Sequence, residues 1–279
     1  NGGQLNEVVV RPNGLYGSPA LAYTTQTKGV VAGYSAGYIG SGEYGGADAN
    51  VTGFRAEYNN TTGTGKSTLA KQLAQQLGYV YVDTGAMYRA VTFYAMQNKW
   101  VSENSLDKDA IIKDLNNINL RFQYNSDLGF AEMFLNNVNV EQAIRTLEVS
   151  QNVSKVAEIS EVRAKLVQQQ QEMGKEKGIV MDGRDIGTVV FPDAELKIFM
   201  TASARTRAER RYNELIEKGQ RVTFEEVLEN VEQRDYIDTH REDSPLVQAN
   251  DAIVVDNSSL TKEEQFNLVL QLVKDKINS

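Results

Sequence analysis

Thr64-Gly65-Lys66-Ser67-Thr68 is the stretch that decides the fold of this chain. Leu69, Leu73 and Leu77 follow it at helical spacing, so the sequence predicts a helix over residues 66–77. A Gly-Lys-Ser step at the start of a helix directs backbone N–H groups, a lysine ammonium and a hydroxyl that can bind Mg²⁺ at one place. A polyphosphate satisfies all of these groups together. The stretch therefore indicates that the chain binds a nucleoside triphosphate.

The phosphate-binding loop departs from the full pattern at one position. That pattern has a glycine five positions before Gly65, where this chain has Asn60, and Gly63 is an additional glycine inside the loop. A glycine-rich turn that only caps an amphipathic helix stays open as an alternative. If the loop holds ATP, six of its residues are predicted to bind it, and Ser67 is also the predicted metal ligand: Gly63, Thr64, Gly65, Lys66, Ser67 and Thr68.

The composition excludes several classes of protein. The 279 residues are 41% hydrophobic and 24% charged, as in a soluble globular protein of one large or two smaller domains. No run approaches the roughly 18 apolar residues of a membrane span, and no signal peptide is visible. A net charge of −8 argues against a nucleic-acid partner, because a phosphate backbone requires a basic surface. We therefore expect a cytoplasmic protein without a membrane partner.

Cysteine is absent from the chain, and His240 is its only histidine. The sequence thus excludes disulfides, thiolate catalysis and Cys-based zinc sites, as well as triads or metal sites that need several histidines. The chemistry must depend on carboxylates, lysines, arginines and a metal held by oxygen ligands.

Residues 1–60 differ in composition from the rest of the chain. They hold 12 of the 22 glycines and 6 of the 13 tyrosines but only one lysine. This composition favours short β segments or a loose Gly/Tyr-rich loop, with candidate strands at 8–10 and 51–58. We assign residues 1–52 to an N-terminal arm of unknown origin.

From Thr61 onward, expected strands alternate with expected helices. Such alternation is typical of a parallel sheet covered by helices on both faces, so the predicted fold class is α/β. The expected strands are 79–82, 178–181, 196–200 and 252–255. The expected helices are 66–77, 87–97, 107–115, 160–173, 204–218, 224–237 and 262–277.

The alternation is interrupted between residues 119 and 140. Apolar and polar side chains there alternate with a period of two on both sides of a polar turn, which predicts a β-hairpin. We therefore assign residues 98–150 to a small insert, and a decorated loop is the open alternative. Residues 53–97 and 151–279 then form the core.

The strand that leads into the phosphate-binding loop is expected in the middle of the sheet. Both faces of such a strand are buried, so its sequence should be continuously apolar. Residues 54–59 read Phe-Arg-Ala-Glu-Tyr-Asn and instead alternate between apolar and polar types. Either the central strand is a poor one, or residues 1–60 have a separate origin such as a gene fusion. The coincident change of composition favours the second interpretation.

Several longer motifs carry a resemblance to a known family. They are 63–70, Asp83-Thr84-Gly85-Ala86-Met87-Tyr88-Arg89-Ala90, Ile144-Arg145-Thr146 with Glu148-Val149-Ser150, 182–194, and Gln233-Arg234-Asp235-Tyr236-Ile237-Asp238 with Arg241. From residue 63 to about residue 260, the sequence resembles bacterial cytidylate kinases, which are nucleoside monophosphate kinases. The resemblance does not cover residues 1–60.

The resemblance implies a P-loop core, an inserted domain for the nucleoside monophosphate (NMP) at the hairpin, and a short arginine-bearing lid near residues 205–224. It implies transfer of the γ-phosphate of ATP to CMP or dCMP, giving CDP or dCDP and ADP, with Mg²⁺. The expected partners are these small nucleotides, and a monomer is expected. Because phosphoryl transfer aligns two anions and neutralises charge, arginines should converge on the site.

The resemblance also assigns an acceptor-binding set. Three arginines, whose planar forks suit a phosphate, match positions that hold the acceptor phosphate: Arg89, Arg184 and Arg241. Three residues match base-reading positions: Ser154, Arg163 and Asp185. Three match contacts to the ribose or phosphate: Thr84, Arg234 and Asp238. A carboxylate that accepts from cytosine N4 would repel O4 of uracil, so CMP should be preferred to UMP.

The donor side completes the assignment. Lys66 is expected on the β- and γ-phosphates, and Asp182 follows a buried strand where a carboxylate can organise Mg²⁺ through water. Arg210 and Arg211 resemble lid arginines that close over ATP. The predicted catalytic residues are Lys66, Asp182, Arg184 and Arg241. Solvated arginines, a strand-end cap at position 182 and plain helix surface at the base-reading positions are the open alternatives.

Two other functions compete with this prediction. One is a P-loop kinase for AMP, UMP or shikimate, although an AMP kinase has a longer lid than residues 218–224 allow and shikimate kinases lack the hairpin insert. The other is a non-catalytic or impaired fusion protein, in which the N-terminal arm is an interaction module. ATP affinity separates these alternatives.

Overall fold

The computed structural model describes residues 55–59, 65–125, 128, 130–175 and 177–277. The expected strand at 8–10 and the predicted arm of residues 1–52 lie outside these ranges. Gly63 and Thr64 of the phosphate-binding loop also lie outside them, as does Asn60. In the described part of the chain, no helix is long and apolar enough to cross a membrane.

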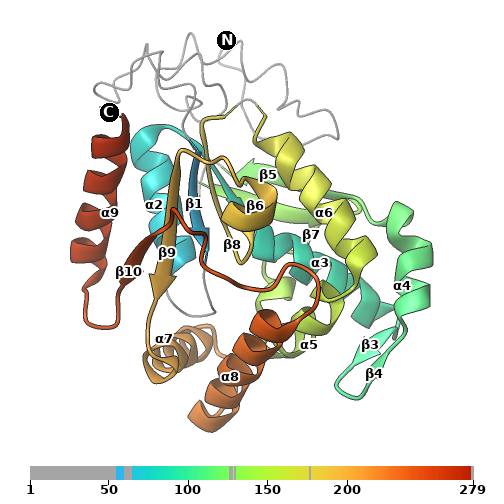
Figure 1. Ribbon diagram of the computed structural model, residues 1–279. Coiled ribbons are helices and arrows are strands. Elements are labelled where there is room, and N and C mark those ends of the chain that lie inside the picture. The colour runs from blue at the N-terminus through green and yellow to red at the C-terminus, as the bar shows by residue number, and fades with distance from the viewer. Residues whose placement is uncertain (1–54, 60–64, 126–127, 129, 176, 278–279) are drawn as a thin grey trace, which may run out of the picture.

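A five-stranded parallel sheet forms the centre of the molecule (Figure 1), and its strand order is β10-β9-β1-β8-β2. The strands are β1 (Arg55–Asn59), β2 (Val80–Asp83), β8 (Ile179–Gly183), β9 (Leu196–Thr201) and β10 (Ile253–Asp256). Each of the four expected strands after residue 61 is present, shifted by one or two residues. The α/β class predicted from the alternation is thereby confirmed.

β1 occupies the middle of this sheet. It pairs in parallel with β8, where Ala56 is opposite Val180, and with β9, where Ala56 is opposite Leu196. Sheet pairing uses backbone groups, which every residue type carries, so an alternating sequence can fill a central position. Residues 55–59 therefore belong to the kinase-like sheet, and a separate origin stays a prediction only for the segment before them.

Helices cover both faces of the sheet, since strands such as β8 carry buried apolar residues on both faces. On one face, α2 (Lys66–Leu77) and α9 (Lys262–Ile277) pack against alternate strand residues such as Val180 and Ile198. On the other face, α3 (Thr84–Gln97) and α6 (Ser160–Met173) pack with Ile179 and Met181. All five residues of β8 are buried, which fixes the position of the Asp182-Gly183 end that follows the apolar part of the strand.

The helices expected at 66–77, 160–173 and 262–277 have the predicted bounds, and the others differ by a few residues. α4 (Lys108–Asp114), α7 (Ala204–Glu217) and α8 (Phe224–His240) also lie where the pattern placed them. One helix was missed, α5 (Leu147–Ala157). It carries Ser154.

The expected hairpin is present as β5 (Leu120–Asn125) and β6 (Phe130–Leu135), which pair antiparallel, with β7 (Val138–Asn139) added beside β6. A smaller hairpin of β3 (Val101–Ser102) and β4 (Ser105–Leu106) precedes it. Leu120, Phe122 and Met133 of the larger hairpin are buried in the same core as α3, so the hairpin packs firmly on the rest of the molecule. The assignment of residues 98–150 to a separate NMP-binding insert stays a prediction.

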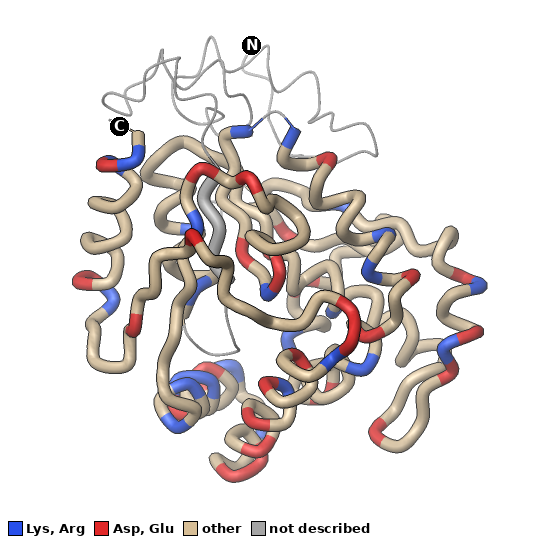
Figure 2. The backbone as a smooth tube through the Cα atoms, in the orientation of Figure 1, with Lys and Arg blue, Asp and Glu red and all other residues tan. Residues whose placement is uncertain are grey.

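α7 and α8 lie beyond the carboxyl ends of the strands and pack on each other (Figure 1). α7 is rich in arginine and α8 in glutamate, as the charge colouring of Figure 2 shows. Arg207 of α7 is buried and forms an ion pair of 2.5 Å with Asp235 of α8. This contact fixes the two helices over the edge of the sheet where ligands of open parallel sheets bind.

Candidate active site

Two neighbouring strands end side by side in acidic residues. Asp83 at the end of β2 is paired in register with Asp182 of β8. The Thr84 hydroxyl donates a hydrogen bond of 2.8 Å to the backbone carbonyl of Asp182, which joins the start of α3 to the end of β8. Gly183 is required at this junction, because a Cβ there would lie 2.5 Å from Thr84 Oγ1. The sheet thus brings two carboxylates and a helix start together at its carboxyl edge.

The start of α2 faces the same edge. Gly65 precedes the helix with φ of 79°, a left-handed conformation that glycine adopts without strain. The Ser67 hydroxyl donates a hydrogen bond of 2.6 Å to Asp182, and Tyr81 donates a second one of 3.1 Å to the other carboxylate oxygen. Burial and the nearby Asp83 raise the pKa of Asp182. Burial lowers the pKa of Lys66 to about 8.

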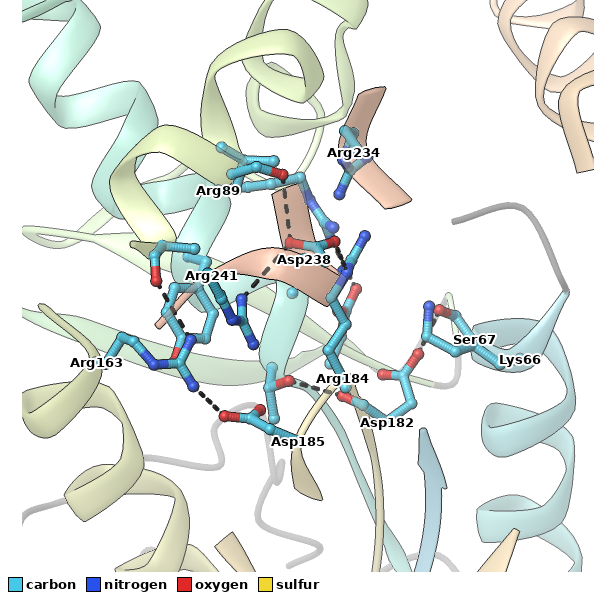
Figure 3. Close-up of a pocket in the computed structure, with 18 residues that line it drawn as sticks. Lys66, Ser67, Arg89, Arg163, Asp182, Arg184, Asp185, Arg234, Asp238 and Arg241 are labelled. Carbon is cyan, nitrogen blue, oxygen red and sulfur yellow. Dashed lines mark hydrogen bonds and ion pairs between the residues drawn. The ribbon is translucent and has the colours of Figure 1, made fainter. Parts of the chain in front are cut away.

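A cavity of about 560 Å³, including open solvent, opens beside these residues. It is lined by every one of the nine predicted CMP-binding residues, together with Lys66, Ser67 and Asp182: Thr84, Arg89, Ser154, Arg163, Arg184, Asp185, Arg234, Asp238 and Arg241. These residues come from α2, α3, α5, α6 and α8, from β8 and from the residues directly after β8 and α8, and Figure 3 shows their charged groups directed toward a common centre. We call this space the acceptor cavity.

The arginines of the acceptor cavity are held by carboxylates. Asp238 forms an ion pair with Arg184 and a longer contact of 3.5 Å with Arg241 (Figure 3). Arg163 forms a buried ion pair with Asp185. Two of the predicted phosphate-binding arginines are therefore held by one carboxylate, and the predicted base-reading pair Arg163 and Asp185 is held by its own ion pair.

Cations outnumber anions in the acceptor cavity. Six lysine and arginine side chains line it, against four aspartates. Burial and the neighbouring Arg184 lower the pKa of Arg234, because desolvation and a nearby positive charge both disfavour its charged form. Three buried groups that line the cavity have neither a hydrogen bond nor an ion-pair contact among the described residues: the Tyr88 hydroxyl, Arg89 Nε and Arg234 Nε. An anionic ligand of about two charges, such as a phosphate monoester, would balance the charge.

A second cavity, of about 1300 Å³ including open solvent, adjoins the first. It is lined by Gly65, Lys66, Ser67 and Thr68 at the start of α2, by Arg211 of α7, and by Glu141, Arg145 and Phe130 of the predicted insert. Six residues line both cavities: Lys66, Ser67, Asp83, Arg89, Arg184 and Arg234. We call this second space the donor cavity. The two cavities meet where Lys66 and Arg184 lie, so two anionic ligands would face each other across those cations.

Comparison with known proteins gives one consistent family. The family model described as cytidylate kinase matches residues 60–275. The chain belongs to the cytidylate kinase family. The cytidylate kinase of Flavobacterium johnsoniae is 70% identical over 214 residues, which are 77% of this chain and 93% of that protein. Those of Flavobacterium psychrophilum and Porphyromonas gingivalis are 66% and 50% identical, over 76% and 77% of this chain and 94% of each relative.

Family membership makes the chain a phosphotransferase that uses ATP as co-substrate. It confirms the resemblance drawn from the motifs between residues 63 and 260, and it favours a pyrimidine nucleotide over shikimate or AMP as acceptor. The matched region begins at residue 60, directly after β1.

The predicted lid arginines of this family member are in different positions. Arg211 lines the donor cavity and forms an ion pair of 2.9 Å with Glu214. Arg210 lines neither cavity, and its guanidinium donates to the side chain and backbone of Asn257. His240 also lies outside both cavities, stacked on the exposed Tyr236.

Several residues of the site were not assigned a role from the sequence. In the acceptor cavity they include Asp83, Gly85 and Tyr88, which lie within the Asp83–Ala90 motif. In the donor cavity they include Glu141 and Arg145. Arg145 lies within a motif that carried the family resemblance, so its position in that motif was the available signal.

Proposed function

We propose that this chain transfers the γ-phosphate of ATP to CMP or dCMP, giving ADP and CDP or dCDP, in a Mg²⁺-dependent reaction. The observation that supports this proposal most directly is the pair of adjoining cavities that share Lys66 and Arg184. Phosphoryl transfer needs two mutually repelling phosphate chains held in line, with cations between them. The shared cations supply that arrangement.

In the proposed mechanism, the acceptor phosphate binds to Arg89, Arg184, Arg234 and Arg241. Arg89 and Arg234 each have a buried Nε without a hydrogen-bond partner among the described residues. A phosphate oxygen can accept from such a donor, and a bidentate contact with a guanidinium also fixes the orientation of the phosphate. The acceptor nucleophile is an oxygen of this phosphate, which is ionised at neutral pH, so the protein need not supply a general base.

Cytosine recognition is assigned to Asp185, Arg163 and Ser154. Arg163 and Asp185 are almost fully buried and form an ion pair, so the carboxylate is fixed in orientation. A fixed carboxylate accepts a hydrogen bond from the cytosine amine and repels the O4 of uracil. Thr84 and Asp238 are assigned to the sugar and phosphate of the acceptor, where they line the same cavity.

On the donor side, Lys66 and the backbone of residues 63–68 are assigned to the β- and γ-phosphates of ATP. Arg211 lines this cavity and is assigned to ATP as well. Arg210 is also assigned to ATP, and its guanidinium would have to leave Asn257 when the predicted lid closes. Burial lowers the pKa of Lys66, and the phosphates of ATP would favour its charged form.

The residues present also fit Mg²⁺. Ser67 Oγ and an Asp182 carboxylate oxygen lie 2.6 Å apart at the start of α2. Mg²⁺ prefers oxygen ligands, and in nucleotide sites it keeps waters and binds phosphate oxygens, so few protein ligands are needed. Ser67 would bind the ion directly and Asp182 through water. The ion would supply charge neutralisation on the phosphates. We further propose that the protein acts as a monomer in the cytoplasm.

The proposal is tested by incubating the protein with ATP and Mg²⁺ and separating the nucleotides by ion-exchange chromatography. We expect CDP and ADP in equal amounts with CMP, the corresponding products with dCMP, and much slower turnover with UMP. Chelation of the metal with EDTA should stop the reaction. If ADP forms with none of CMP, dCMP and UMP, the proposed function is wrong, and an impaired or non-catalytic protein becomes the better interpretation.

A further inference from the structure

Arg145 contacts Asp83 and Arg211, which are distant from it in sequence, as well as the nearby Glu141. It ends a short 3₁₀ turn, Ala143–Arg145, directly before α5. Its Nη1 lies 2.8 Å from Asp83 at the end of β2, and its Nε and Nη2 lie 3.0 and 2.5 Å from Glu141. Only 20% of its side chain is exposed. One guanidinium thus links the edge of the central sheet to the predicted insert.

Asp83 connects Arg145 to the acceptor cavity, because it also binds Arg89. The carboxylate oxygen that binds Arg145 also accepts a hydrogen bond of 2.9 Å from Arg89. The second oxygen caps α3 by accepting from the Ala86 backbone N–H. Burial opposes ionisation of Asp83, but Arg89 and Arg145 hold its pKa well below the usual value. Arg89 is therefore oriented by a carboxylate that Arg145 also holds.

Glu141 anchors the other end of the contact. It is buried, and its second carboxylate oxygen accepts from the Met133 backbone N–H of β6 at 3.0 Å. Any displacement of the hairpin relative to the sheet must therefore stretch or break the bonds to Arg145.

The third link of Arg145 reaches α7. The backbone carbonyl of Arg145 accepts a hydrogen bond of 3.1 Å from Arg211 Nη2. Arg211 lines the donor cavity, whereas Arg89 lines both cavities. A chain of contacts thus runs from Arg89 through Asp83 and Arg145 to Arg211, from the acceptor side to the donor side.

We infer that Arg145 is a positioning residue that couples acceptor binding to donor binding. It orients Arg89 through Asp83, ties the hairpin to the sheet through Glu141, and receives Arg211 from α7. The inference rests on the proposed kinase function, because that function defines the two ligands. A guanidinium suits this role because its rigid planar fork can contact Asp83 and Glu141 at once in a fixed geometry, whereas the ammonium of lysine is a compact charge on a flexible chain.

The experiment measures the dissociation constant of CMP by calorimetry, with and without a non-hydrolysable ATP analogue and Mg²⁺. In the wild-type protein, the analogue should tighten CMP binding by a factor in the range of about 5 to 150, as expected for coupled sites. In Arg145→Lys this factor should fall close to 1. The value of kcat/KM for CMP should also fall by about 100-fold, because Arg89 loses its fixed orientation.

Two further variants separate positioning from general stability. Arg121→Lys is the matched control, since Arg121 lies over the ring of Phe134 in the same hairpin and lines neither cavity. It should keep both the coupling factor and kcat/KM. Glu141→Gln keeps the shape of the side chain but weakens its bond to Arg145, so it should show an intermediate loss of coupling.

The possible results distinguish failure of the coupling from failure of the proposed function. If Arg145→Lys unfolds in a thermal melt, Glu141→Gln decides the question alone. The inference is overturned if the wild-type protein shows no coupling, or if the folded variants keep the wild-type factor. Absence of turnover in the wild-type protein would instead refute the proposed function, while the binding measurement would still test the coupling.

Discussion

The acceptor cavity and the donor cavity differ in the balance of charged side chains that line them. In the acceptor cavity, Asp185 and Asp238 each hold arginines in ion pairs, and four aspartates stand against six cations. The described lining of the donor cavity has eight lysines and arginines against three acidic residues. This difference fits the proposed roles, because a polyphosphate on the donor side carries more negative charge than the phosphate of a mononucleotide on the acceptor side. Four predictions test this contrast and the fold on which it depends, from the largest expected effect to the smallest.

Removal of β1 should have the largest effect. β1 pairs with both β8 and β9 and leads into the start of α2, so deletion of residues 1–59 should abolish cooperative unfolding and all activity. Deletion of residues 1–52 keeps β1 and should leave kcat nearly unchanged. Thermal melts and the rate of CDP formation compare the two. A cooperative melt and full activity after deletion of residues 1–59 would show that β1 is not the central strand.

Lys66→Met removes a cation that the two cavities share. We expect kcat to fall by about 1000-fold, because the charge that develops on the transferred phosphoryl group loses its nearest ammonium. Rates of ADP formation with saturating CMP provide the measurement. Lys262→Met, at the exposed start of α9, is the control and should keep the wild-type rate. A loss of less than tenfold in Lys66→Met would contradict the assigned role.

Asp185→Asn should change only the acceptor side. An amide can donate to O4 of uracil as well as accept from N4 of cytosine, so the preference of kcat/KM for CMP over UMP should fall by about 100-fold. KM for ATP should stay the same. Asp243→Asn is a matched control, since Asp243 contacts Arg163 at 3.6 Å without lining the cavity. An unchanged preference in Asp185→Asn would remove Asp185 from base recognition.

The substitution Glu214→Gln, on the donor side, should have the smallest effect of the four. Partial burial opposes ionisation, but Arg211 and Lys218 lower the pKa of Glu214 to about 2. A carboxyl group with a depressed folded-state pKa stabilises the protein above its unfolded pKa of roughly 4.3, and this contribution is lost as the pH falls toward 2. Glu214→Gln should therefore lower the melting temperature at neutral pH by only about 1–2 °C, since the side chain is half exposed.

Thermal melts repeated from pH 7 down to pH 3 test the direction in which the contribution of Glu214 to stability changes with pH. The difference between wild type and Glu214→Gln should shrink with falling pH. A difference that grows as the pH falls would mean that the ion pairs of Glu214 do not stabilise the fold. Glu209→Gln, in the more exposed pair with Arg205, is the control and should show less difference at every pH.

Local signals in the sequence were enough for much of the fold. The helix over residues 66–77 was predicted with its observed bounds because its leucines lie on one face and glycines flank it. β8 was recognised by its continuous apolar run, which its complete burial explains. α5 was missed because buried polar residues, Ser150, Asn152 and Ser154, interrupt its apolar stripe. Those polar positions face other buried polar groups, such as Asn230, which no local pattern reveals.

The candidate site, too, could be predicted only where a local motif carried the signal. Residues in recognisable motifs, such as Arg184 and Asp185 after β8, were assigned roles, and the structure brings them into one cavity. The role of Arg145 was not predicted, because it depends on Asp83 and Glu141, which only the folded chain brings within bonding distance. β1 was misjudged for a related reason: its place follows from backbone pairing with β8 and β9 rather than from the types of its own residues.

The carboxylates that hold the arginines of the acceptor cavity have a consequence for selectivity. Asp238 and Asp185 act as built-in counter-ions, so an incoming anion must compete with them for Arg184, Arg241 and Arg163. A small anion such as inorganic phosphate offers only its charge in this competition, whereas a nucleotide adds the contacts of its base and sugar. We expect inorganic phosphate to compete weakly with CMP in a displacement titration. The acidic residues of the acceptor cavity thereby favour a nucleotide over a free phosphate ion.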